Sequence, residues 1–214
     1  MKKLFIIFLC VLPMLASAGV KERSLAKDLV TAYMENHGNA EKVLKKPPID
    51  ITERTRVCGL CHGPEGNSKQ ANVPSLAAQN PVYFVEQLLV FKNKGRYPKM
   101  MHEMVNNLDE ESMIVIALHY SKIPRNLTME VNEKLGNQGK KLYADLCSHC
   151  HGEIATGSND TYANLRAQRP DYLITTIKRF RNNDAKRSSH VMGSAVKGMS
   201  DEEISALANY IAGL

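Results

Sequence analysis

The 214-residue sequence contains no tryptophan, and only 6% of its residues are aromatic. Stretches in which apolar and polar residues alternate, which predict half-buried β-strands, are scarce. We therefore expect an all-α protein. Long basic runs are also absent and the formal net charge is only +6, which argues against a nucleic-acid-binding protein.

Long hydrophobic runs are missing beyond the N-terminus, so no later stretch reaches the roughly 20 residues that a membrane span requires. Residues 1–3 are positive, 4–15 are apolar, and 16–18 are small. This pattern is typical of a secretory signal peptide over residues 1–18, and an uncleaved anchor is the alternative. Cleavage would remove Lys2 and Lys3, lower the formal charge from +6 to +4, and leave no transmembrane span.

Cysteine is also scarce. There are five, and Cys10 lies in the expected signal peptide. The other four belong to two Cys-x-x-Cys-His pentapeptides, at residues 58–62 and 147–151, which is the attachment signature of c-type haem. Two thiols on one helical turn can each bind a vinyl group of the haem, and the next histidine then supplies the proximal imidazole. We expect two haem c groups, held by Cys58, Cys61, Cys147 and Cys150 and ligated by His62 and His151.

Two other kinds of site use Cys-x-x-Cys pairs: a zinc site formed by both pairs and a thioredoxin-like redox pair. A zinc site would leave the histidine after each pair without a role. A redox pair would need a strand, a turn and a helix that the sequence does not predict. The haem interpretation accounts for both histidines and for every cysteine outside the signal peptide.

From the first pentapeptide onward the sequence repeats itself. A shift of 89 residues superposes the two motifs, and it also carries Gln79 onto Gln168 and Pro81 onto Pro170. Each proline suits the first position of a helix. After these helices the shift becomes 91 residues, so the second copy is slightly longer than the first.

Two repeats in a chain of this length predict two small tandem domains, each built around one haem. Each repeat closes with a helix, with Asp109 as the N-cap in the first and a capping box of Ser200 and Glu203 in the second. A helix over 24–37 precedes the first repeat only; we expect it to pack on the first domain, with partner docking as the alternative. The expected segments are a signal peptide over 1–18, an N-terminal helical extension over 19–46, domain 1 over 47–124, a linker over 125–137 and domain 2 over 138–214.

The second axial ligand decides what each iron does. A methionine sulfur closes the iron and raises its potential, which suits electron transfer, whereas an open position suits chemistry on small molecules. The shift of 91 superposes Met101 on Met192, and each lies seven residues before the hydrophobic residue that opens the last helix. We expect these two to be axial ligands. The alternatives are Met104, Met100 and His102 in the first domain and His190 in the second.

With these features the chain resembles the dihaem cytochrome c4 family of class I c-type cytochromes. The similarity is carried by CGLCHGPEGNS over 58–68, PSLAAQ over 74–79 and DEEISALANYI over 201–211, and it covers about residues 50–214. It implies two class I cytochrome c domains related by a pseudo-twofold axis, with haem propionates meeting near the interface. It also implies His/Met ligation of both irons and a periplasmic location.

One position departs from the pattern of this family. In class I domains a proline about a dozen residues after the proximal histidine offers its carbonyl to the free N–H of that histidine. Pro74 takes this place in the first copy, whereas Ala163 replaces the proline in the second. Because any backbone carbonyl can accept the bond, its orienting role can survive the replacement, on a less rigid loop.

These features predict an electron carrier that is not an enzyme. We expect it to shuttle single electrons between respiratory partners, such as a membrane-bound reductase and a terminal oxidase. The alternatives are a flavocytochrome-like electron-accepting subunit of a larger dehydrogenase and a dihaem peroxidase with one open haem. Basic residues before the two methionines are a candidate rim for acidic partners, with an ordinary solvated surface as the alternative: Lys92, Lys94, Arg96, Lys99, Lys178, Arg179, Arg181, Lys186 and Arg187.

Overall fold

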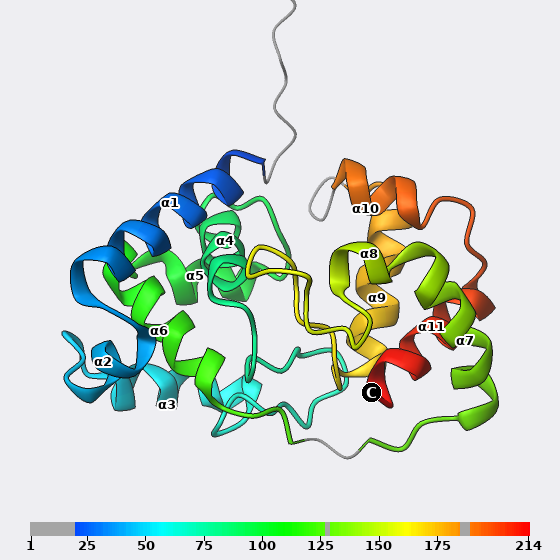
Figure 1. Ribbon diagram of the computed structural model, residues 1–214, viewed down its shortest axis with the longest axis horizontal. Helices are drawn as coiled ribbons and strands as arrows, with labels where there is room; N and C mark the ends of the chain where they lie inside the picture. Colours follow the sequence, from blue (N-terminus) through cyan, green and yellow to red (C-terminus); the bar gives the residue numbers. More distant parts are fainter. Residues whose placement is uncertain (1–19, 127–128, 185–188) are drawn as a thin grey trace, which may run out of the picture.

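The computed structural model describes residues 20–126, 129–184 and 189–214, and every regular element in these ranges is a helix. The all-α prediction is confirmed. The helices form two groups on either side of a central region of loops (Figure 1). The first group consists of α1 (Val20–His37), α2 (Ala40–Lys45), α3 (Ile51–His62), α4 (Pro81–Lys92), α5 (Lys99–Asn106) and α6 (Glu110–Lys122). The second consists of α7 (Glu133–Leu146), α8 (Ser148–His151), α9 (Pro170–Arg181), α10 (His190–Ala195) and α11 (Asp201–Ala212).

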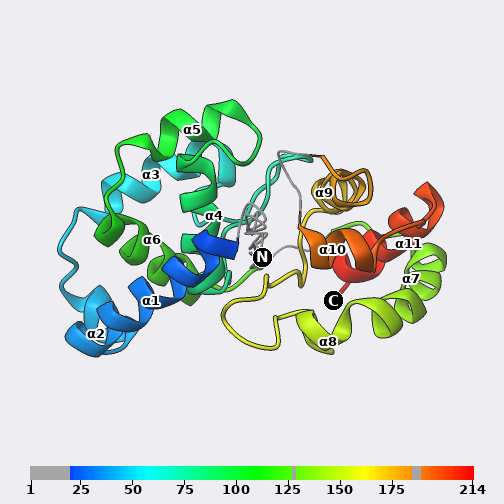
Figure 2. The same ribbon diagram turned by 90° about the horizontal axis from the view of Figure 1, so that it is seen from above.

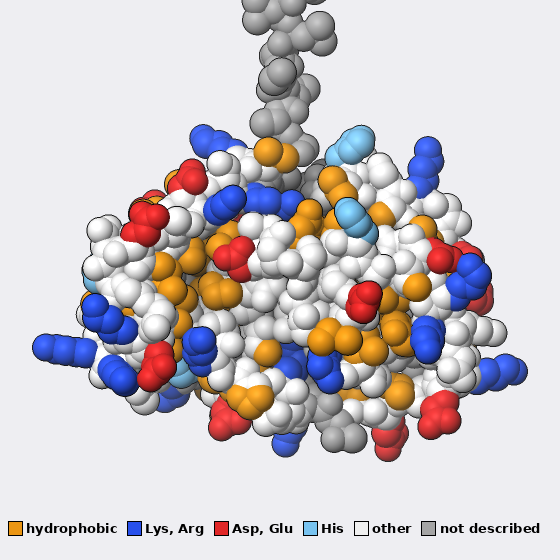
Figure 3. Space-filling view, viewed as in Figure 1, with side chains coloured by type: hydrophobic (Ala, Val, Ile, Leu, Met, Phe, Trp, Pro, Cys, Tyr) orange, Lys and Arg blue, Asp and Glu red, His pale blue; other side chains and the backbone are white. Residues whose placement is uncertain are grey.

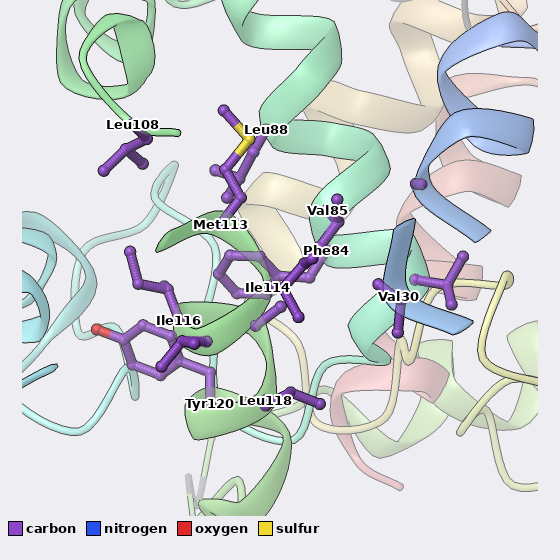
Figure 4. Packing of buried hydrophobic residues seen from close by; sticks show 14 of the residues in the cluster. Val30, Phe84, Val85, Leu88, Leu108, Met113, Ile114, Ile116, Leu118 and Tyr120 are labelled. Atoms are coloured by element: carbon purple, nitrogen blue, oxygen red, sulfur yellow. The ribbon is translucent and has the colours of Figure 1, made fainter. Parts of the chain in front are cut away.

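The first hydrophobic core lies around α4 and α6. Val85 and Met113 are completely buried there (Figure 4). Helix α1 packs across α4 and α6, and its Val30 joins the same core. The helix predicted over 24–37 begins earlier, at Val20. The N-terminal extension is therefore part of the first folding unit and shields one face of α4.

The second core is formed by α11 packed against α7 and α9. Ile204, Leu207 and Ile211 of α11 have at most 1% of their surface exposed, as has Tyr143 of α7. These apolar residues recur every three or four positions, which places them on one face of α11. The two cores thus use corresponding helices, because α6 and α11 close the two repeats.

The sequence repeat is also a repeat of backbone conformation. Ala78 and Ala167, which the shift of 89 superposes, both have left-handed backbone angles, with φ of 56° and 51°. The N–H of Ala78 donates to the carbonyl of Tyr120 over 2.9 Å, and that of Ala167 donates to the carbonyl of Ile211 over 3.1 Å. These equivalent bonds fasten each connecting loop to the last helix of its own repeat.

Several helix ends lie where the sequence predicts them. Pro81 and Pro170 are the first residues of α4 and α9. The side chain of Asp109 accepts a backbone N–H in the first turn of α6, and Ser200 and Glu203 form the predicted capping box of α11. Such caps satisfy N–H groups that have no partner within the helix, so they fix where α6 and α11 begin.

The expected linker over 125–137 is too long at its C-terminal end. Helix α7 begins at Glu133, and the side chain of Asn132 caps it by accepting the N–H of Leu135. Gly136 and Gly139 lower the intrinsic helix propensity of this segment, which hides the helix in the sequence. Packing against α11 overrides that low propensity.

Gly139 gives a direct test of the contact between α7 and α11. A Cβ atom there would overlap the carbonyl oxygen of Ala206, whereas a Cβ at Gly136 would lie 3.9 Å from the Cα of Tyr210, an ordinary contact. We expect Gly139→Ala to lower the free energy of unfolding by about 1–3 kcal/mol. The matched Gly136→Ala variant should raise it by up to about 1 kcal/mol. Chemical denaturation measures both, and equal effects of the two variants would contradict this packing.

Candidate haem sites

The first pentapeptide occupies the last turns of α3. Cys58 and Cys61 are partly buried free thiols, and Cys58 packs against the first core. Leu60 lies between them and has 72% of its surface exposed, so the two thiols and this leucine point to different sides of the helix. The side of α3 that carries the thiols therefore faces the core, as covalent attachment of a buried haem requires.

The second pentapeptide begins at a helix break. Helix α7 ends at Leu146, and the short α8 then carries Cys150 and His151. Cys147 is a partly buried free thiol that packs against the second core. The hydroxyl of Tyr143 donates to the carbonyl of Gly152 over 2.5 Å, which ties the residue after the histidine back to α7.

The two motif histidines are buried and held by the same kind of bond. His62 and His151 are 8% and 9% exposed, and their Nδ1 atoms lie 2.8 Å from the Pro74 carbonyl and 3.0 Å from the Ala163 carbonyl. A carbonyl can only accept, so Nδ1 carries the proton and donates in both cases. The lone pair is therefore on Nε2, the atom that would bind iron. The hydrogen bond is present whether proline or alanine supplies the carbonyl.

Burial lowers the pKa of both histidines below the ordinary value, because an imidazolium loses hydration there. The hydrogen bonds to Pro74 and Ala163 offset part of this effect. Arg96 lowers the pKa of His62 further through charge repulsion. Both imidazoles are thus kept neutral at pH 7, which is the form that binds a metal.

The predicted methionines differ in exposure from their neighbours. Met101 and Met192 are both partly buried, and each packs against the core of its own domain. Met100 and Met104 instead have 62% and 49% of their surface exposed. The packing therefore favours Met101 over the two nearby methionines as a ligand.

The alternative histidine ligands are placed less favourably. Nε2 of His102 donates to the carbonyl of Arg96 over 2.7 Å, so only Nδ1 has a lone pair and the ring is held toward the backbone of Arg96. His190 is exposed at the start of α10. Neither arrangement suits a ligand that must enter a buried core.

Two buried guanidinium donors are suited to bind the propionate carboxylates of a haem. Arg125 donates to the carbonyls of Ala77, Asn164 and Arg166, and so lies between the two repeats. Its Nη2 is buried without an acceptor, as is Nε of Arg169. Burial lowers the pKa of Arg125 to about 10. An acidic group beside either donor would satisfy it and stabilise the guanidinium charge.

Part of the expected basic rims is buried or ion-paired, whereas Lys92, Lys94 and Lys99 are exposed. Arg96 is only 7% exposed, and Lys178 and Arg181 both form ion pairs with Asp201. On the face drawn in Figure 3, basic and acidic side chains are interspersed. Residues 186 and 187 lie outside the described ranges. The partners of these cations are distant in the sequence, so the charge pattern alone overestimates the free positive charge.

The zinc alternative finds no support in the part of the chain that is described. There, no group of three or more histidine, cysteine, aspartate or glutamate side chains is arranged to hold a metal ion. The two cysteine pairs lie in separate helix groups (Figure 2), where each has its own histidine and its own hydrophobic core.

Known proteins that are similar to this chain are c-type cytochromes. Residues 137–214 match the cytochrome c family. Cytochrome c4 of Thiocapsa roseopersicina is 32% identical over 192 residues, which cover 84% of this chain and 98% of that protein. The chain belongs to the cytochrome c4 family. The crystal structure of reduced recombinant cytochrome c4 from Pseudomonas stutzeri is similar with a TM-score of 0.70 and 27% identity, over 77% of this chain and 96% of that one.

A further similar protein is named as the electron acceptor of a dehydrogenase and not as a cytochrome c4. The thiosulfate dehydrogenase electron acceptor of Stutzerimonas stutzeri strain A1501 is 25% identical over 167 residues, which cover 72% of this chain and 77% of that protein.

Membership of this family confirms the predictions of the fold class, the cofactor and the electron-carrier function. The protein consists of two class I cytochrome c domains with covalently bound haem c, and it is an electron carrier and not an enzyme. The peroxidase alternative is thereby set aside. None of the helices in the described ranges is long and apolar enough to cross a membrane.

Removal of one cysteine pair tests which residues attach each haem. We expect the denatured protein to have the mass of the polypeptide plus two haems, since thioether bonds survive denaturation. The Cys58→Ala/Cys61→Ala and Cys147→Ala/Cys150→Ala variants should each retain one haem. Mass spectrometry after denaturation makes the measurement, and retention of two covalent haems by either variant would contradict the assignment.

Proposed function

We propose that this chain is a periplasmic dihaem carrier that takes single electrons from one respiratory redox protein and delivers them to another, such as a terminal oxidase. When bound, each haem supplies a one-electron Fe(III)/Fe(II) couple. The observation that carries the proposal is the duplicated site: two buried, neutral histidines, each fixed by a carbonyl 2.8 or 3.0 Å away. Export through the signal peptide over 1–18 is part of the proposal.

The chain's residues have separate roles at each site. Cys58 and Cys61 would attach one haem and His62 would ligate its iron, and the second pentapeptide would do the same in the other domain. Met101 and Met192 would each supply the second protein ligand of one iron, and a methionine sulfur there would exclude small molecules and raise the potential. The apolar cores exclude water. They would therefore favour the ferrous haem, which carries less charge than the ferric haem.

The interface between the domains fixes the two sites relative to each other. The side-chain amide of Asn80 donates to the carbonyls of Thr156, Asn159 and Tyr162 in the other repeat. The N–H of Tyr83 donates to the carbonyl of Asp160 over 3.0 Å. Electron transfer between sites depends steeply on their separation, and these bonds hold that separation constant.

Exposed apolar residues that are close in sequence to the candidate haem-binding residues of each domain suit short-lived docking of redox partners. Leu60 and Met100 are 72% and 62% exposed near the first site, and Ile154 and Val191 are 55% and 62% exposed near the second. Transient redox complexes bury little surface, so small patches of this kind are sufficient. Exposed apolar residues in each domain would allow electron entry at one site and exit at the other.

A second candidate function is that of an electron-accepting partner of a dehydrogenase. The similarity to the thiosulfate dehydrogenase electron acceptor favours it. The sites would be the same, and only the donor would differ. Stable co-purification with a dehydrogenase distinguishes this function from that of a free carrier, which should purify alone.

The axial methionines provide the test of the proposal. We expect Met101→Ala and Met192→Ala each to remove half of the methionine-to-iron charge-transfer band, to lower the potential of one haem, and to let carbon monoxide bind half of the reduced haem. The unaltered protein should bind no carbon monoxide. Met104→Ala, at an exposed position of the same helix as Met101, is the control.

Two results would contradict the assignment. If the unaltered protein binds carbon monoxide at half of its haem, one iron is open. If Met104→Ala removes half of the band while Met101→Ala leaves it intact, the ligand of the first domain is Met104.

A further inference from the structure

Two glutamine side chains cross the interface between the domains. Oε1 of Gln168 accepts the N–H of Ser75 over 2.8 Å, and its Nε2 donates to the carbonyl of Ser75 over 3.0 Å. In the opposite direction, Oε1 of Gln79 accepts the N–H of Asn164 over 2.7 Å, and its Nε2 donates to the carbonyl of Asn164 over 3.1 Å. The shift of 89 residues relates the two pairs, so the contact is reciprocal, as at a twofold interface.

Each of these contacts ends on the peptide group that holds a proximal histidine. The N–H of Ser75 and the carbonyl of Pro74 belong to one peptide group, and that carbonyl accepts Nδ1–H of His62 over 2.8 Å. A continuous path of two hydrogen bonds therefore runs from His62 through one peptide group to Gln168 of the other domain.

The second domain has the same path. The N–H of Asn164 and the carbonyl of Ala163 share a peptide group, and that carbonyl accepts Nδ1–H of His151 over 3.0 Å. This path ends on Gln79 of the first domain. Each histidine is thus connected to the glutamine that lies in the opposite domain.

We propose that Gln168 and Gln79 are positioning residues that set the basicity of the proximal histidine in the opposite domain, and with it the potential of that haem. An amide whose N–H donates has a more polarised carbonyl, which accepts a hydrogen bond more strongly. A stronger bond from Nδ1–H makes the imidazole a more basic ligand. A more basic ligand stabilises the ferric state, so each glutamine lowers the potential of the haem across the interface.

The surroundings of the two glutamines support this role. Gln168 is 2% exposed and Gln79 is 8% exposed, so water does not compete for their bonds. Each Oε1 also accepts the N–H of the next residue in its own chain, over 3.0 Å for Gln168 and 2.9 Å for Gln79, which fixes the rotamer. The residue before each glutamine is a left-handed alanine, Ala78 or Ala167, a strained conformation that persists where the surrounding structure requires it.

The orientation of each amide is determined by its partners. The N–H of Ser75 can only donate and its carbonyl can only accept, so Oε1 of Gln168 must face the first and Nε2 the second. The same holds for Gln79 and Asn164. Replacing the amide by a thioether of similar length would remove the acceptor and leave most of the packing.

The test compares Gln168→Met, Gln79→Met and Gln138→Met in the holoprotein. Gln138 is exposed on α7 and is the matched control. The measurements are the two midpoint potentials and the Nδ1–H resonances of 15N-histidine-labelled reduced protein. For Gln168→Met we expect the resonance of His62 to move upfield and the potential of that haem to rise, by up to about tenfold in its reduction equilibrium, or about 59 mV.

The proposal predicts a different set of histidine shifts for each variant. Gln79→Met should move the resonance of His151 and leave that of His62 in place, and Gln138→Met should move neither. Gln168→Glu keeps an oxygen acceptor for the Ser75 N–H, so it should not raise the potential. If one methionine variant does not fold, the other carries the test with the roles of the histidines exchanged.

The inference is overturned if Gln168→Met moves both histidine resonances equally, moves only that of His151, or lowers stability without moving either. It rests on the proposed ligation by His62 and His151, which the unaltered protein tests separately. Ligated imidazoles have ring protons shifted strongly upfield by the haem ring current. Absence of that shift would contradict the ligation itself, whereas its presence with unmoved resonances in the variants would contradict only the role of the glutamines.

Discussion

The hydrogen bond from Nδ1–H of each motif histidine to a backbone carbonyl constrains the rest of the structure. It requires the chain after each pentapeptide to return to the histidine twelve residues later, at Pro74 and at Ala163. The returning loop covers the imidazole, and burial keeps the ring neutral. The histidine can therefore present a lone pair on Nε2 within an apolar core. A rearrangement of the loop would change the orientation of the histidine.

The same two loops form the interface between the domains. Residues 63–80 and 152–169 lie between the two groups of helices in both views (Figure 1, Figure 2). They supply the carbonyls for the histidines and also the side chains that bond across the interface, including Asn80 and the two glutamines. Arg125 adds a further connection where the chain leaves the first domain. The orientation of the two candidate haem ligands and the association of the domains thus depend on one set of residues, which is the structural basis of the proposed communication between the sites.

Much of this architecture follows from local sequence features. The pentapeptides, the prolines at the starts of α4 and α9 and the caps at Asp109 and Ser200 act over a few residues, so the sequence predicts them directly. The repeat likewise identifies Gln79 and Gln168 as equivalent, but only the folded chain shows that each reaches the opposite domain. Arg125, in the expected linker, gave no signal of its burial.

The features that the sequence mispredicts depend on distant partners. Arg96 resembles a solvent-exposed cation, yet its guanidinium bonds to the hydroxyl of Tyr172, 76 residues away. The start of α7 is concealed by Gly136 and Gly139, because the close approach to α11 that Gly139 permits becomes visible only when the helices pack. Tertiary contacts, and not local propensity, decide both cases.

Transfer of an electron between the two haems of one molecule is the central claim, and rapid partial reduction of the oxidised protein tests it most directly. A pulse that delivers less than one electron per chain should be followed by an absorbance change in which the electron redistributes between the two sites. The account predicts a single rate that does not change with protein concentration, because the hydrogen-bonded interface holds both sites in one chain. A redistribution rate proportional to protein concentration would show exchange only between molecules and would contradict the account.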